Sequence, residues 1–328
     1  MIYIIFDTNA AREFVVGQNL ENLEEFAQSM AMKFEAHGLK LSISPLVIHE
    51  LLYHLVDKND KDFSISFKAI KVLMLVMEYQ RKGAKRTMMS PSELLIANEI
   101  YHLRIESREM MYSQMMSIAE EIAHGNIDNI PDLHTIDGGT PKTYIDDIEN
   151  AFAVDIRKVS HDLEVLANVS CRSFEEVLNS KNGEDLLITY FSRTTYNLLM
   201  NEGKVPDYRR FLPSLVPYSP ESCREYFAFF NFMEKGNIEI KRRYPAFLKL
   251  AKEVVRRIHQ SKNQISDEKL KNYVWDIKLM FHVNDHTINH HPFRFITSDK
   301  TMLLASGAFH DKNNVMYFSE FKKWLDEE

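Results

Sequence analysis

The chain has 328 residues, 45% hydrophobic and 27% charged, so its composition predicts a packed core and excludes wholesale disorder. Its net charge of −7 argues against a general coat protein for nucleic acid, although an acidic enzyme can carry a local basic surface. No apolar stretch approaches the roughly 18–20 residues that cross a bilayer, and we expect no signal peptide before the first strand. Two cysteines do not make a disulfide framework, so we expect a cytoplasmic protein.

The first predicted element is a strand over residues 2–6, an unbroken apolar run rich in β-branched and aromatic side chains. Such a run is typical of a parallel strand that is buried on both faces. The run stops at Asp7, and Thr8 and Asn9 follow. Open α/β sheets place their chemistry just beyond the carboxyl ends of their strands, so Asp7 is a candidate functional residue.

Two helices and a strand follow. Apolar residues at helical spacing predict a helix over residues 20–37, which Gly38 ends. Alternation over residues 39–43 predicts a second strand. Ser44 and Pro45 are typical of a helix start, and that helix carries Glu50 on its second turn.

The pattern turns helical over residues 53–264. Long amphipathic runs predict helices, and hydroxyl residues followed by proline or glutamate predict their starts. The runs cover residues 67–80, 93–123 and 144–166, and the starts are at Ser90, Thr140, Ser173 and Ser219. Glycine and proline predict loops at 125–141 and 205–219.

The last part returns to an α/β pattern. Ser266 caps a predicted helix that reaches Phe281 and carries Asp276 before an apolar run. A strand over residues 293–297 leads directly into Ser298 and Asp299, and a short strand at 315–318 precedes a closing helix over 319–325.

We therefore predict an α/β fold with a parallel sheet flanked by helices, its core split by a large all-helical insertion. Residues 1–52 and 265–328 form the α/β domain in this prediction, and residues 53–264 form the helical insertion domain.

Four acids are candidates for one site: Asp7, Glu50, Asp276 and Asp299. Because parallel strands bring their carboxyl ends to one edge of the sheet, Asp7 and Asp299 can converge although they lie near opposite ends of the chain. Carboxylates that converge repel one another unless a cation lies between them. Mg²⁺ and Mn²⁺ prefer such oxygen ligands.

At these residues the chain resembles the PIN-domain nucleases. The family pattern has a hydrophobic strand that ends in Asp-Thr-Asn, a Glu early on a helix after the second strand, an Asp before an apolar helical run, and a strand that leads into Thr-x-Asp. This sequence has the four parts in that order, with Asp7, Glu50, Asp276 and Asp299 as the acids. The gap between Glu50 and Asp276 is much longer than is usual in the family.

The resemblance implies a metal-dependent endonuclease, with RNA favoured over DNA because the family mostly acts on RNA. Asp7, Glu50, Asp276 and Asp299 would be catalytic and would hold Mg²⁺ or Mn²⁺, which activates a water for phosphodiester hydrolysis. Thr8, Asn9 and Ser298 would orient the carboxylates or contact phosphate.

Three other motifs do not favour a different enzyme class. His49 and His54 are five positions apart, about 500° of helix rotation, so they do not form the zinc motif that needs a spacing of four. A series of histidines at 282, 286, 290 and 291 is interrupted by loop residues and indicates a polar loop. A haloacid-dehalogenase-like phosphatase needs an Asp where this chain has Asn9.

A basic stretch in the insertion is a candidate nucleic-acid surface, with one aromatic ring available for stacking on a base. It comprises Lys241, Arg242, Arg243, Tyr244, Lys249, Lys252, Arg256 and Arg257. The alternative to an enzyme is an inactive PIN-like binding module whose helical domain binds nucleic acid or a protein. The sequence leaves open an antitoxin-like or other protein partner and a homodimer.

Overall fold

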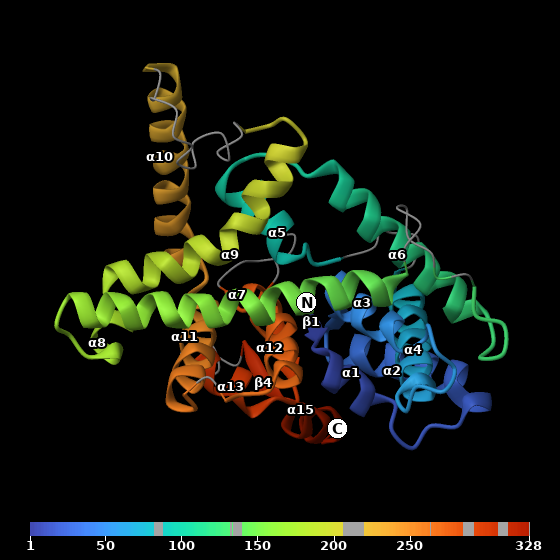
Figure 1. Cartoon of the computed structure of the whole chain (residues 1–328). Coiled ribbons are helices and arrows are strands. Elements are labelled where there is room, and N and C mark those ends of the chain that lie inside the picture. The colour runs from blue at the N-terminus through green and yellow to red at the C-terminus, as the bar shows by residue number, and fades with distance from the viewer. Residues whose placement is uncertain are drawn as a thin grey trace.

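The computed structural model describes residues 1–81, 88–131, 133, 140–205, 220–262, 264–284, 292–307 and 314–327, with only the backbone described for 220–229. The two ends of the chain, blue and red in Figure 1, come together below the long helix α7 (Pro141–Val169). The fold is mixed α/β and mostly helical, as the sequence predicts.

A four-stranded parallel sheet joins the two ends, in the order β2-β1-β3-β4. Strand β1 lies between β2 and β3, with Ile4 opposite Leu41 on one side and Arg294 on the other. The strands are β1 (Ile2–Phe6), β2 (Leu39–Leu41), β3 (Phe293–Thr297) and β4 (Val315–Tyr317). The pairing of β1 with β3 confirms that the sheet is built from both ends of the chain.

Short helices connect and cover the sheet. The Phe6 ring packs on Phe14 and Phe321, with ring centroids 5.2 and 5.7 Å apart, so helices from both ends of the chain share one aromatic core. The elements of the two ends are α1 (Thr8–Phe14), η1 (Leu20–Asn22), α2 (Leu23–Ala36), α3 (Pro45–Tyr53), α12 (Asp267–Leu279), η4 (Met280–His282), α13 (Lys300–Ser306) and α15 (Phe318–Asp326).

The middle of the chain is helical, as predicted, and its helices share one contiguous apolar core with the sheet. Helix α10 extends away from the other helices in Figure 1. Besides α7, the middle elements are α4 (Phe63–Arg81), α5 (Ser92–Leu95), η2 (Ile96–Ile100), α6 (Glu106–His124), α8 (Phe174–Leu178), α9 (Lys181–Asn201), α10 (Pro220–Arg243) and α11 (Pro245–Gln260).

One helix prediction is wrong. The run over residues 93–123 is interrupted after Ile100, and α6 begins only at Glu106. His102 has a φ of 55°, a left-handed conformation that cannot continue an α-helix. The apolar periodicity resumes beyond this break, so it predicts one helix where the structure has three segments.

Helix α4 lies against the α/β part although the sequence places it in the insertion. Its Gln80 lies at the edge of the sheet and pairs with β2 as a neighbouring strand would. The side-chain oxygen accepts from Leu41 N at 2.8 Å, and the side-chain nitrogen donates to Leu39 O at 3.0 Å. The edge strand is thereby covered, and the packing shows no boundary at residue 53. The division of the chain into two domains stays a prediction.

Within the described ranges, no helix combines the length and the apolar character that crossing a bilayer requires.

Candidate metal centre

Asp7 lies at the carboxyl end of β1, where the sequence places it, and its side chain is 2% exposed. One carboxylate oxygen accepts from Ala10 N at 2.6 Å and caps α1. The other accepts from the Thr297 hydroxyl and, at 3.2 Å, from Ser298 N. Asp7 therefore joins the ends of β1 and β3.

Asp299 follows β3 and caps α13. Its Oδ1 accepts from Thr301 N at 2.5 Å and from Met302 N at 2.9 Å. Its own N–H donates to the Thr297 hydroxyl at 3.0 Å, and that hydroxyl donates to Asp7. Thr297 is thus the link between the two acids.

Glu50 comes to the same place from α3. Its Oε2 accepts from the hydroxyl of Thr8, the residue next to Asp7. Burial raises the pKa of Glu50 to about 7; the Thr8 hydrogen bond and the Arg12 charge oppose this rise, and the charge of Asp7 adds to it. Thr8 therefore contacts Glu50, whereas Asn9 is exposed.

Asp276, on helix α12, is the fourth acid of the group. Its pKa lies well above the usual range because of burial, and also because of the negative charges of Asp299, Glu50 and Asp7. Burial likewise raises the pKa of Asp7 to about 6, against the hydrogen bonds that it accepts, and Asp299 adds to this rise. The fold brings all four acids close enough for their charges to act on one another.

The donor set fits a divalent cation. Four carboxyls repel one another there, and the Ser298 hydroxyl oxygen is buried with no hydrogen-bond partner among the described residues. No three of the four acids have carboxylate oxygens that all lie within 4.8 Å of one another, so the arrangement is open. Among the described residues, one other group meets that spacing. An open arrangement suits Mg²⁺, which keeps several waters when it binds to protein carboxylates.

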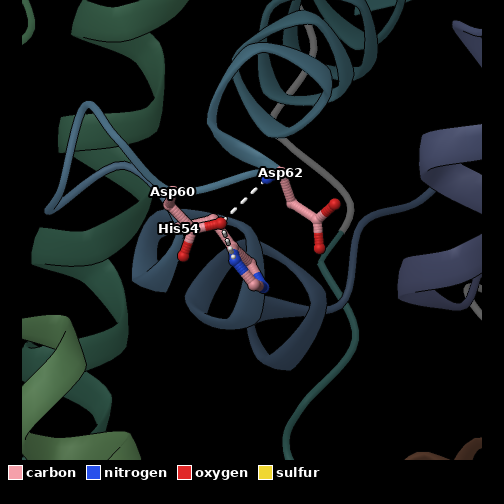
Figure 2. Close-up of side chains that lie close together, drawn as sticks. All are labelled: His54, Asp60 and Asp62. Carbon is pink, nitrogen blue, oxygen red and sulfur yellow. Dashed lines mark hydrogen bonds and ion pairs between the residues drawn. The ribbon is translucent and has the colours of Figure 1, made fainter.

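That other group is His54, Asp60 and Asp62 (Figure 2), and its contacts are those of a local turn. Asp60 Oδ1 lies 3.0 Å from His54 Nδ1 and accepts from the backbone N–H of Asp62 at 2.8 Å. The Asp62 carboxylate lies 3.7 Å from an Arg12 nitrogen. Hydrogen bonds and one ion pair explain this cluster without a metal.

Arg12 is a residue that the sequence analysis missed. It lies on α1. Its charge opposes the rise that burial causes in the pKa of Glu50, and it adds to the fall that burial causes in the pKa of His54. Its Nε and Nη2 are buried without a hydrogen-bond partner among the described residues. In the sequence, the one indication of its role is that this basic residue lies about one helical turn after the Asp-Thr-Asn motif. Thr297 belongs to the Thr-x-Asp motif, but its contact with Asp7 depends on the pairing of β1 with β3 and has no signal in the sequence.

The candidate nucleic-acid surface needs one correction. Tyr244 is fully buried, and its hydroxyl donates to Glu99 at 3.1 Å, so the prediction that its ring can stack on a base is wrong. The charged members contact protein acceptors: Lys241 and Lys252 with Glu184, Arg242 and Arg243 with Glu239, Arg256 with Glu175, Arg257 with Glu253, and Lys249 with the Leu304 carbonyl. Their role toward nucleic acid stays a prediction.

The described histidines of these motifs contact other protein groups. His49 packs on Tyr144, with ring centroids 4.9 Å apart, while His54 pairs with Asp60. His282 is fully buried, and its Nε2 lies 2.9 Å from the Ser44 hydroxyl. Residues 286, 290 and 291 lie outside the described part of the chain.

Comparisons with family models, with curated proteins and with solved structures find no match for this chain. The likeness to PIN-domain nucleases therefore depends on the residues and on their arrangement.

Proposed function

We propose that the chain is a metal-dependent endonuclease with a PIN-like α/β domain, and that it hydrolyses phosphodiester bonds in RNA. The observation that supports this most is the convergence of Asp7, Glu50, Asp276 and Asp299 from four separate elements. The pKa values of Asp7, Glu50 and Asp276 are raised, and such buried carboxyls cost stability, so a cation is the simplest reason for the cluster. The proposal includes a cytoplasmic location, as the sequence predicts.

Each residue has a role in this proposal. The four carboxylates would hold one or two Mg²⁺ or Mn²⁺ ions. Thr8 orients Glu50, and Thr297 orients Asp7, because each hydroxyl donates to the carboxylate. The positive charge of Arg12 beside Glu50 favours the ionised carboxylate. The chemistry that such a cation supplies is Lewis-acid activation of a water and stabilisation of charge on the leaving oxygen.

Helix capping is the competing explanation for Asp7 and Asp299, since each accepts backbone N–H groups at a helix start. An Asp299→Asn variant separates the two roles. Asparagine caps helices about as well as aspartate, so the capping contribution is kept while the charge is lost.

The test uses the purified full chain with end-labelled RNA and DNA of matched sequence, in Mn²⁺, in Mg²⁺ and in EDTA. We expect Mn²⁺-dependent cleavage of RNA that falls to the EDTA level in Asp299→Asn, with the melting temperature in EDTA nearly unchanged. Asp267→Asn is the matched control, because Asp267 is a 70% exposed acid on the helix that carries Asp276. Cleavage that survives Asp299→Asn would leave capping as the explanation. Binding without any cleavage would favour the inactive binding module.

A further inference from the structure

The structure has a cavity of about 510 Å³, and none of the four acids lines it. Helices α7 and α9 form much of its wall, and α5, η2, α6, α12 and η4 contribute the rest. Aromatic rings line it: Tyr144, Phe152, Tyr190, Phe191 and Phe281. Its volume lies within the range of roughly 300–1,000 Å³ that small-molecule sites occupy.

Opposite charges meet in the wall of this cavity. Glu93 is 4% exposed, and its carboxylate accepts from the Tyr112 hydroxyl and lies 3.7 Å from Lys278 Nζ. The Arg108 guanidinium lies 4.8 Å from the centre of the Tyr144 ring, and its charge also acts on Glu93. Two cations thus face one buried carboxylate.

Two further polar atoms belong to residues that line the cavity. Thr195 Oγ1 and Asn197 Oδ1 are buried, and neither makes a hydrogen bond with a described residue. A buried polar atom without a partner costs about 1–3 kcal/mol, which makes a polar ligand favourable. Asp147 and Asp155 also line the cavity, but both are exposed, so water screens their charges far more than those of the buried groups.

We infer that this cavity binds a mononucleotide. The aromatic side chains offer surfaces for a planar base, and Arg108 with Lys278 offers charge for a phosphate group. Thr195, Asn197 and the exposed aspartates can bind the hydroxyl and amino groups of sugar and base. The site is distinct from the metal centre, because none of the four acids lines the cavity. Asp276 and Lys278 are two positions apart on α12, about 200° of helix rotation, so they lie on different faces of that helix.

Calorimetric titration of the full chain tests this inference. AMP, GMP, CMP and UMP are titrated in EDTA, so that binding does not depend on a metal or on nuclease activity. The matching nucleosides and inorganic phosphate are titrated separately. We expect at least one nucleotide to bind about tenfold or more tightly than its nucleoside and than phosphate, because only the nucleotide uses both halves of the site. Equal affinity of nucleoside and nucleotide would overturn the anionic part of the inference.

Two variants locate the binding. Ala151 is exposed and lines the cavity, so Ala151→Trp should fill it and abolish binding without disturbing the core. Val154→Trp is the matched control on the same helix, 70% exposed and not among the residues of the cavity wall. Arg108→Gln should weaken nucleotide binding about ten- to a hundredfold and leave nucleoside binding unchanged. Circular dichroism checks the fold of each variant. Absence of nucleotide binding, or binding that Ala151→Trp leaves intact, would refute the inference.

Discussion

Asp7→Asn is the substitution that most directly tests the electrostatic argument for the metal centre. Burial and the neighbouring Asp299 raise the pKa of Asp7 to about 6 from an ordinary 3.8. Without a cation, the ionised carboxylate therefore destabilises the folded chain. We expect metal-free Asp7→Asn to gain stability relative to the natural chain as the pH rises, and to lose the stabilisation that Mn²⁺ gives.

The magnitude follows from the pKa. A group with a raised pKa costs nothing below its unfolded value, and its cost grows with pH until it is complete above its folded value. For Asp7 the full cost is about 3 kcal/mol above pH 6, and about 1 kcal/mol is already present at pH 4.5. The asparagine loses a hydrogen bond to Thr297 or Ser298 at every pH. That loss cancels when the variant and the natural chain are compared at two pH values. The difference between their free energies of unfolding should therefore change by about 2 kcal/mol from pH 4.5 to pH 8.

Urea unfolding in EDTA at pH 4.5 and pH 8 measures this shift, and thermal unfolding with and without Mn²⁺ measures the metal effect. Asp162→Asn, an exposed acid on α7, is the control and should show neither change. The reasoning is refuted if the stability difference between Asp7→Asn and the natural chain is the same at both pH values. The metal assignment fails if Mn²⁺ stabilises the variant as much as the natural chain.

Three further substitutions test other contacts. Thr8→Val removes the hydroxyl that donates to Glu50, and we expect the Mn²⁺-dependent RNA cleavage rate to fall about tenfold; an unchanged rate would remove Thr8 from the site. Gln80→Leu leaves the polar groups of β2 unpaired and should cost roughly 2–4 kcal/mol in urea unfolding, whereas Gln28→Leu on the exposed face of α2 should cost little. Burial lowers the pKa of His282 to about 4 from 6.5. Because the unfolded chain takes up the proton first, His282 destabilises the fold as the pH falls below 6.5. The natural chain should lose about 2 kcal/mol more than His282→Gln between pH 8 and pH 5, and equal losses would contradict the burial argument.

Local patterns were sufficient for much of the fold. The strand at residues 2–6, the caps at Ser173 and Thr140 and the strand at 293–297 lie where the sequence predicts them, because each depends on neighbouring residues alone. The predicted helix start at Ser90 is wrong, because α5 begins at Ser92 and has no side-chain cap. Glu93 instead contacts Tyr112 and Lys278, residues that are distant in the sequence.

The sequence by itself determined the kinds of residue in the candidate site and the elements that carry them, since an acid after a buried strand is a local signal. Only the tertiary structure decided that Asp276 and Glu50 act on each other's charge across the helical insertion, that Thr297 bridges Asp7 and Asp299, and that Tyr244 is buried. These facts depend on the pairing of β1 with β3 and on the packing of α12, which bring together segments from opposite ends of the chain. The spacing of apolar residues predicts which face of a helix is buried, but it does not predict which element packs against that face.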